Sequence, residues 1–182
     1  ICGLKSIEYL NNNLNYYSLM PTNLYGENDN FDPRSSHVIP GMISKFHQAK
    51  MNNCKTVVLW GDGSPIRDFI HADDVANGMI SIIEQGYNKP INLGSGKGVT
   101  IKEIAEAIAG NLSDECKIVW DTSKPSGDKK RIMNTSRAES IGIRPSISLN
   151  EGIKTTIEWY QKNTDNLSKR YNAFTDKLYK RH

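Results

Sequence analysis

The sequence has no apolar run long enough to cross a membrane. A membrane-spanning helix needs roughly 20 consecutive apolar residues, and the best stretch here, Val57-Val58-Leu59-Trp60, is short. No sequence period recurs either, which excludes collagen, coiled-coil and repeat architectures. We therefore predict a protein that does not insert into a membrane.

Cysteine is scarce, and no metal-binding spacing is present. The chain contains 3 cysteines, Cys2, Cys54 and Cys116, which are widely spaced and odd in number. This pattern is typical of reduced thiols in a cytosolic protein, and the absence of a Cys-x-x-Cys pair argues against a zinc site. The 4 histidines lack the i, i+4 pairing of a metal-binding helix. The sequence thus predicts a cytoplasmic protein without a metal site.

An excess of one charge is also missing. Lys and Arg total 23 against 20 for Asp and Glu, so the formal net charge is only +3. A nucleic-acid-binding domain is usually more basic and sets aromatic residues within its basic patch. Hydrophobic residues make up 37% of the chain, which is too many for a disordered tail. The 182 residues suffice for one domain with a sizeable core. A globular protein without a nucleic-acid partner is predicted.

Basic residues are nevertheless denser in two segments, 124–137 and 162–182. The second is interpreted as solvated surface and a frayed tail. The first includes Pro125 and Gly127, which predict a loop. Composition leaves open whether this loop holds a diphosphate or is simply exposed.

The chain lacks an initiator Met. It begins Ile1-Cys2-Gly3-Leu4, with neither the charged region nor the long apolar region of a signal peptide. Either the chain was processed or the sequence starts partway through a longer protein.

Strands and helices alternate along the chain, which predicts an α/β fold. The predicted strands are 16–20, 56–60, 67–71, 90–93 and 117–120, with a turn-rich loop over 23–35. Five helices are predicted. The first ends near residue 10, the second runs from a Ser36 cap to about Met51, and the third runs from an Asp73 or Asp74 cap to Gly86. The last two start at the capping boxes Thr100–Glu103 and Ser148–Glu151. No linker divides the chain, so we predict one lobe over residues 1–162 and a loosely attached basic tail over 163–182.

Two of these helices carry apolar stripes at helical spacing, which predicts the faces that they bury. The predicted buried residues are Ile39, Met42, Ile43, Phe46 and Ala49 in the first, and Val75, Met79, Ile82 and Ile83 in the second.

A Gly-rich segment over residues 92–98 lies between a predicted strand and a predicted helix, as phosphate-binding loops do. Val99 stands where a dinucleotide fingerprint needs a third Gly, and Gly98 stands where a Walker loop needs Ser or Thr. A tight strand-to-helix turn is therefore the default interpretation.

Three further side chains are candidates for proton transfer or nucleotide binding. His37 stands at the predicted mouth of a helix, where the helix N-terminus favours the neutral base form; a structural histidine is the alternative. Trp60 precedes a Gly-rich turn and Arg67 follows it, which would pair a stacking ring with a guanidinium for a diphosphate. A core Trp and a surface Arg are the alternative for that pair.

Several segments together resemble the GDP-L-fucose synthase family, within the extended short-chain dehydrogenase/reductase class of nucleotide-sugar epimerases and dehydratases. These segments are residues 20–26, 29–31, 36–40 and 60–69, His71, Asp73-Asp74, and residues 92–94 and 123–125. The resemblance covers about residues 1–162. It implies the C-terminal part of an extended short-chain dehydrogenase fold (NAD(P)-binding, Rossmann-like), mostly its substrate-binding lobe.

The resemblance also implies an activity. Family members convert GDP-4-keto-6-deoxy-D-mannose to GDP-L-fucose by epimerising C3 and C5 and then reducing C4 with NADPH, and they are homodimers. His37 matches the acid–base histidine. The expected NADP contacts are Pro21, Thr22, Asn23, Leu24 and His37. The expected GDP-sugar contacts are Lys45, Trp60, Arg67, Lys117 and Arg131.

The chain also departs from the family pattern. The Gly-rich NADP fingerprint, the Tyr-x-x-x-Lys pair and the partner Cys of the acid–base pair do not occur in it. We therefore expect the C-terminal part of a longer enzyme, inactive as these 182 residues alone. Ser126 and Asn134 stand where acidic residues are usual, which leaves fine specificity open. The alternatives are another nucleotide-sugar epimerase, dehydratase or reductase, and a non-catalytic GDP-sugar-binding module.

Overall fold

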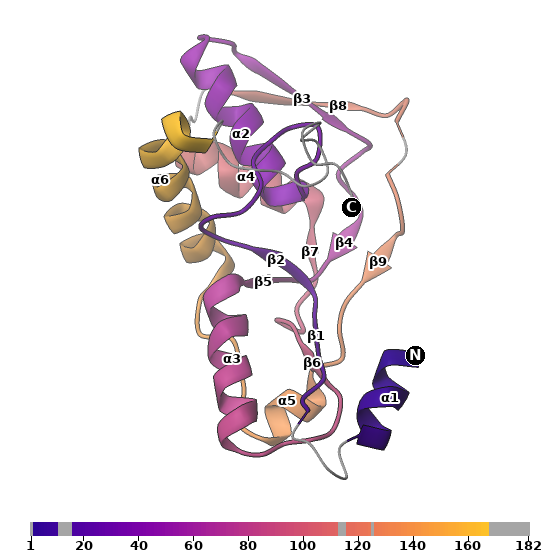
Figure 1. Ribbon diagram of the computed structural model, residues 1–182. Coiled ribbons are helices and arrows are strands. Elements are labelled where there is room, and N and C mark those ends of the chain that lie inside the picture. Colours follow the sequence, from indigo (N-terminus) through magenta and orange to yellow (C-terminus); the bar gives the residue numbers. More distant parts are fainter. Residues whose placement is uncertain (1, 11–15, 113–115, 125, 168–182) are drawn as a thin grey trace, which may run out of the picture.

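The computed structural model describes residues 2–10, 16–112, 116–124 and 126–167 of the 182-residue chain. Helices and strands alternate along it, which confirms the α/β class (Figure 1). The helices are α1 (Cys2–Leu10), α2 (Val38–Met51), α3 (Ala72–Glu84), α4 (Ile101–Leu112), α5 (Ser136–Ser140) and α6 (Leu149–Leu167). The strands are β1 (Leu19–Pro21), β2 (Asn23–Tyr25), β3 (Thr56–Trp60), β4 (Ile66–Arg67), β5 (Phe69–His71), β6 (Ile91–Leu93), β7 (Val99–Thr100), β8 (Lys117–Asp121) and β9 (Lys130–Arg131).

The strands form short, mostly parallel pairs. β1 pairs with β6, β2 with β5 and β3 with β8, each in parallel. β4 lies between β7, which is antiparallel to it, and β9, which is parallel. Parallel pairs require long crossovers, and here the connections carry helices: α3 lies between β5 and β6, and α4 between β7 and β8.

Two hydrophobic cores hold these elements together. Helices α2, α4 and α6 pack beside β3 and β8 in the upper part of Figure 1. The lower core joins α3, α5, β1 and β6. Each fully buried aliphatic or aromatic side chain contributes roughly 1.5–3 kcal/mol. The fully buried members of the upper core include Ile39, Ile43, Phe46, Ile104, Ile108 and Ile153.

The predicted apolar stripes are confirmed for α2 and only in part for α3. All five predicted residues of α2 are buried. In α3, Val75 and Ile82 are buried, but Met79 and Ile83 are 46% and 57% exposed. The prediction for those two was wrong because the lower core contacts only one narrow face of α3.

The helix caps confirm the capping box of Thr100, confirm one bond of the box of Ser148, from the Glu151 N–H to the Ser148 hydroxyl at 3.3 Å, and correct two predictions. Glu103 accepts a hydrogen bond from the Thr100 backbone N–H at 2.7 Å, which completes the predicted capping box. The cap of α2 is His37 and not Ser36, and its side chain makes no capping bond. The cap of α3 is His71, whose Nδ1 accepts a hydrogen bond from the Asp73 N–H at 3.3 Å. The predicted Asp73 or Asp74 cap is therefore wrong.

Two further corrections concern strands. The predicted loop over 23–35 begins with strand β2, and the predicted strand over 67–71 is divided at Asp68 into β4 and β5. Sequence periodicity could not show either feature because each of these strands is only two or three residues long. Helix α6 continues to Leu167, while residues 168–182, most of the predicted tail, lie outside the described residues, as do the predicted helix-stopping residues 11–13.

Gly152 allows a close contact that a larger residue would destroy. It is buried in the first turns of α6, and a Cβ placed on it would collide with the Tyr25 hydroxyl. We expect Gly152→Ala to destabilise the protein by about 1–3 kcal/mol, the usual cost of overpacking. Gly110, in α4, is the matched control because a Cβ there meets nothing within 4 Å. Gly110→Ala should stabilise by about 0.5–1 kcal/mol through helix propensity. Urea unfolding measures the change in stability of both variants. Equal urea midpoints for the two would contradict the close contact between Gly152 and Tyr25.

Candidate functional site

The first cavity of interest brings His37 to the segment predicted to contact the cofactor. This cavity, of about 370 Å³, is lined by Thr22, Asn23 and Leu24 from the chain around β2 and by His37 at the start of α2. Leu24 is 38% exposed there, and His37 is also exposed. Because the imidazole makes no capping bond, it is available to a ligand. The cavity therefore combines an apolar side chain with a possible acid–base group.

A second cavity, of about 480 Å³, collects positive charge beside the first. Arg67 of β4 and Lys130 and Arg131 of β9 line it together with residues 21–23. Thr22 and Asn23 line both cavities. Thr22 and Asn23 are thus the shared wall between a cavity with His37 and a cavity with three cations. Three cations suit an anionic group such as a diphosphate.

Arg67 is held in place by the loop that precedes β9. Its Nη1 donates hydrogen bonds to the backbone oxygen of Asp128 at 2.7 Å and to that of Ile66 at 2.9 Å. A Cβ placed on Gly127, whose φ is +77°, would lie 3.4 Å from Nη2. The loop therefore fixes the guanidinium through Nη1, and the Arg67 side chain borders the cavity.

Trp60 lies on the surface at the end of β3. Its side chain is 68% exposed, which excludes the alternative of a core tryptophan. The Nζ of Lys45, from α2, lies 5.7 Å from the centroid of the ring, within the range of a cation–π contact. An exposed ring next to an ammonium group is suited to an aromatic base that carries phosphate.

The turn after Trp60 is organised by Asp62. Its carboxylate accepts hydrogen bonds from the backbone N–H and the hydroxyl of Ser64, at 3.0 and 2.8 Å, and from the Ser126 hydroxyl at 3.1 Å. The bonds from Ser64, and less so the one from Ser126, lower the pKa of Asp62. The Ser126 bond ties the loop before β9 to the turn after Trp60. Ser126 thus donates to the Asp62 carboxylate, and an acidic side chain at position 126 would be repelled by that carboxylate.

Of the predicted site residues, Lys45, Trp60 and Lys117 line none of the three cavities, and Lys117 is also distant from Trp60. Lys117 pairs with Thr56 at the start of the β3–β8 ladder, whereas Trp60 pairs with Asp121 at its end. Four residues of strand separate the two positions, about 13 Å at the usual rise. Lys117 therefore lies away from Trp60, while His37, residues 21–24, Arg67 and Arg131 are connected through shared cavities.

Asp68 is the residue that sequence reasoning missed. It is fully buried, and its carboxylate accepts hydrogen bonds from the N–H groups of Ser95, Gly96 and Met133 at 2.9, 3.2 and 3.2 Å. Its backbone oxygen accepts from the Thr22 hydroxyl at 3.0 Å and from Asn23 Nδ2 at 2.7 Å. Asp68 therefore joins the shared wall of the two cavities to two loops. The sequence feature that could have indicated a buried role was a single acidic residue, between Arg67 and Phe69, inside a segment predicted to be a strand.

The hydrogen bonds to Asp68 also discriminate between the two interpretations of the Gly-rich segment over 92–98, a phosphate loop and a tight turn. The N–H groups of Ser95 and Gly96 point at the Asp68 carboxylate, and the N–H of Lys97 donates to the Ser95 hydroxyl at 3.1 Å. These amides are already used within the protein. The interpretation as a tight strand-to-helix turn is therefore favoured over a phosphate loop.

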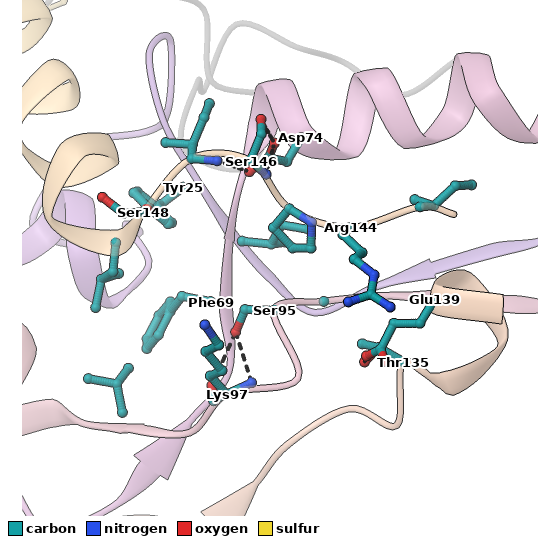
Figure 2. A pocket seen from close by; sticks show the side chains of 17 residues that line it. Tyr25, Phe69, Asp74, Ser95, Lys97, Thr135, Glu139, Arg144, Ser146 and Ser148 are labelled. Carbon is teal, nitrogen blue, oxygen red and sulfur yellow. Dashed lines mark hydrogen bonds between the residues drawn. The ribbon is translucent and has the colours of Figure 1, made fainter. Parts of the chain in front are cut away.

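A third cavity, of about 560 Å³, is bordered by Gly94, Ser95 and Lys97 of that turn (Figure 2). Lys97 and Arg144 line it, and no predicted site residue does. Asp74 belongs to its wall and accepts hydrogen bonds from the Ser146 N–H and hydroxyl, at 2.9 and 2.8 Å. Burial, with a smaller effect of the Asp74 carboxylate, raises the pKa of Tyr25. The Tyr25 hydroxyl therefore stays protonated at neutral pH, and Asp74 ties α3 to the segment before α6.

Two absences bear on the type of site. Among the described residues, no three His, Cys, Asp or Glu side chains are grouped as metal ligands. None of the helices in the described part of the chain is long and apolar enough to cross a bilayer.

Comparison with known proteins points in one direction. Residues 5–94 match the NAD dependent epimerase/dehydratase family. The putative GDP-L-fucose synthase 2 of Arabidopsis thaliana is 48% identical over 146 residues, which cover 79% of this chain and 44% of that protein. The GDP-L-fucose synthase of Escherichia coli (strain K12) is 38% identical over 177 residues, which cover 91% of this chain and 55% of that protein. The chain thus spans about half the length of the curated relatives it matches.

A solved structure gives the same indication. The GDP-L-fucose synthetase from Naegleria fowleri bound to NADP superimposes with a TM-score of 0.77 and 27% identity, over 82% of this chain and 46% of that one. Most of this chain therefore shares its fold with a protein crystallised bound to NADP.

Proposed function

We propose that the chain provides the GDP-sugar-binding part of a GDP-L-fucose synthase, since residues 5–94 match the NAD dependent epimerase/dehydratase family and a curated GDP-L-fucose synthase is 48% identical to it. The reaction is the epimerisation of GDP-4-keto-6-deoxy-D-mannose at C3 and C5, followed by NADPH-dependent reduction at C4. The observation that carries the proposal is the shared wall: Thr22 and Asn23 border both the His37 cavity and the cationic cavity of Arg67 and Arg131. A sugar between these cavities would place its ring at His37 and its diphosphate at the arginines.

The GDP portion has a corresponding set of side chains. Trp60 offers an exposed ring for the guanine base, and Lys45 lies over that ring. Arg67 and Arg131 are neighbours across the parallel β4–β9 pair, so two guanidinium groups can approach one diphosphate. Lys117 lies at the other end of the β3–β8 ladder, and we leave it out of the proposed pocket.

His37 would move the protons during epimerisation. The C4 ketone acidifies the hydrogens on C3 and C5, so a neutral imidazole can remove a proton from such a carbon or return one to the enolate. Inversion also needs a second acid–base group on the opposite ring face. Cys54 and Cys116, beside the start of the β3–β8 ladder, are not assigned that role.

The residues around His37 fit the nicotinamide end of NADPH. The side chains of Thr22 and Asn23 are bound to the backbone oxygen of Asp68, so this segment has a fixed shape before any ligand arrives. It offers the apolar side chain of Leu24 to the cavity. Pro21, Thr22, Asn23, Leu24 and His37 would hold the ring. When bound, NADPH supplies the hydride for reduction at C4.

The compartment and the oligomeric state of the enzyme are a further part of this proposal. We propose a cytoplasmic homodimer, because curated relatives of this chain are nucleotide-sugar synthases and its widely spaced cysteines suit a reducing compartment. Sedimentation of the complete protein at micromolar concentration tests the dimer.

Calorimetric titration of nucleotides into the complete protein tests the proposed GDP site. GDP should bind more tightly than UDP or dTDP. Arg67→Ala should weaken GDP binding by about 10- to 100-fold, since hydrogen bonds to charged groups contribute about 1.5–3 kcal/mol. Arg137→Ala is the matched control because Arg137 also donates from Nη1 to a backbone oxygen, that of Pro90 at 2.8 Å, but lines none of the three cavities. A preference for UDP, or equal losses in both variants, would sink the GDP assignment.

A further inference from the structure

Cys54 and Cys116 are neighbours in space although 62 residues separate them. Cys54 follows α2 and lies just before β3, and Cys116 lies just before β8. The Cys116 thiol contacts the backbone oxygen of Cys54, with Sγ at 3.9 Å. The Cys54 Sγ lies 3.8 Å from the backbone oxygen of Asn52. Both sulfurs therefore lie against the same short turn at the end of α2.

The strand register explains why the two residues meet. β3 and β8 are parallel, with Thr56 opposite Lys117, and the Lys117 N–H donates to the Lys55 oxygen at 2.9 Å. Cys116 is thus opposite Lys55, and Cys54 is one residue further back. Adjacent strands are about 4.8 Å apart, and disulfides join Cα atoms about 4.4–6.8 Å apart. An offset of one residue across this ladder stays within that reach.

The turn at Cys54 is fixed by the end of α2. The Cys54 N–H donates to the Ala49 oxygen at 2.8 Å, and Asn53 takes up a left-handed conformation with φ of 52°. The β3–β8 ladder holds Cys116 from the other side. The end of α2 and the β3–β8 ladder therefore hold the two residues in adjacent positions.

The two thiols differ in access. Cys54 is exposed, whereas Cys116 is half-buried. Burial, and then the neighbouring Cys54, raises the pKa of the Cys116 thiol. The accessible thiol is the one that reacts first with an oxidant in solution, because attack requires a thiolate that the oxidant can reach.

We propose that Cys54 and Cys116 form a redox-active dithiol site that closes to an intramolecular disulfide in the presence of a small disulfide oxidant of the glutathione type. The Cys54 thiolate attacks one sulfur of the oxidant, forms a mixed disulfide and releases one thiolate. The Cys116 thiolate then attacks the Cys54 sulfur, forms the protein disulfide and releases the second thiolate. The protein loses two protons and two electrons, and the oxidant is reduced to two thiols.

The disulfide would link the end of α2 directly to the start of β8. Trp60, at the far end of β3, is four ladder positions away from Thr56. The link constrains the unfolded chain through a loop of more than 60 residues. By the chain-entropy account, the thermal midpoint should rise on the order of 5 °C on oxidation. Nucleotide binding should be unchanged because the bond lies away from the proposed pocket.

Peptide mapping without reductant tests the site. The complete protein is incubated with glutathione disulfide and digested, and Cys2→Ser serves as the matched control. The expected product is a peptide pair joined through Cys54 and Cys116, in the wild type and in Cys2→Ser alike, together with a rise in thermal midpoint that dithiothreitol reverses. A link from Cys2 to either residue, or between two chains, would overturn the proposal, as would the absence of any link.

Single variants test the order of attack. Cys116→Ser should accumulate a stable glutathione adduct on Cys54, because the resolving thiol is missing. Cys54→Ser should react at least 10-fold more slowly, since only the half-buried thiol remains. Circular dichroism verifies that both variants are folded. A Cys54→Ser variant that reacts as fast as wild type would contradict Cys54 as the attacking residue.

Discussion

Replacing His37 with Gln is expected to lower turnover of GDP-4-keto-6-deoxy-D-mannose by about 10²- to 10⁴-fold, the usual contribution of a positioned acid–base group. Gln keeps hydrogen-bonding capacity at the mouth of the His37 cavity but cannot exchange a proton near neutral pH. GDP affinity should stay within about twofold, because the arginines of the other cavity are untouched. The measurement is NADPH consumption by the complete protein, together with calorimetric GDP binding.

Deuterium exchange separates this role from a structural one. With the keto-sugar in D2O and without NADPH, the wild type should introduce deuterium at C3 and C5, and His37→Gln should not. His47→Gln is the control, since His47 packs edge-on against Tyr160 in the core and lines none of the cavities. Exchange at the wild-type rate in His37→Gln would exclude His37 as the proton-transfer group.

Replacing Asp68 with Ala should cause the largest loss of stability. Three backbone N–H groups would lose a charged acceptor in a fully buried position. Hydrogen bonds to charged groups contribute about 1.5–3 kcal/mol each, so we expect a loss on the order of 5 kcal/mol. Domains are stable by only about 5–15 kcal/mol, so the variant should be largely unfolded or close to it. Urea unfolding followed by circular dichroism measures the loss.

Asp73→Asn is the control for that experiment, because the Asp73 side chain is 74% exposed. It should change stability by no more than about 0.5 kcal/mol. Asp68→Asn offers an intermediate case, since one amide oxygen can still accept while the amide nitrogen faces backbone donors. If Asp68→Ala unfolds at the urea concentration of wild type, the view of Asp68 as the junction of the two loops is wrong.

Local patterns in the sequence were sufficient for part of the fold. The stripe of α2, the strand Thr56–Trp60 and the capping box of Thr100 with Glu103 are formed by residues close in sequence. The register of the strand pairs is not local, and no pattern along the chain indicates that Lys117 lies beside Thr56 and away from Trp60.

Asp68 and Asp74, the two buried aspartates, show most clearly what sequence patterns cannot predict. The Asp68 carboxylate meets partners 27 and 65 residues away, and Asp74 meets Ser146 across 72 residues. A sequence contains no periodic signal for such contacts, so the sequence alone predicts only a helix cap at Asp73 or Asp74. The grouping of His37 with residues 22–24 came from family resemblance, and the shared cavity gives it a physical basis.

Product analysis of the complete protein with GDP-4-keto-6-deoxy-D-mannose and NADPH tests the central claim most directly. The account predicts GDP-L-fucose as the product, inverted at C3 and C5, with one NADPH consumed for each sugar reduced. Reduction without inversion at those carbons, or no NADPH consumption by a protein that binds GDP, would contradict it.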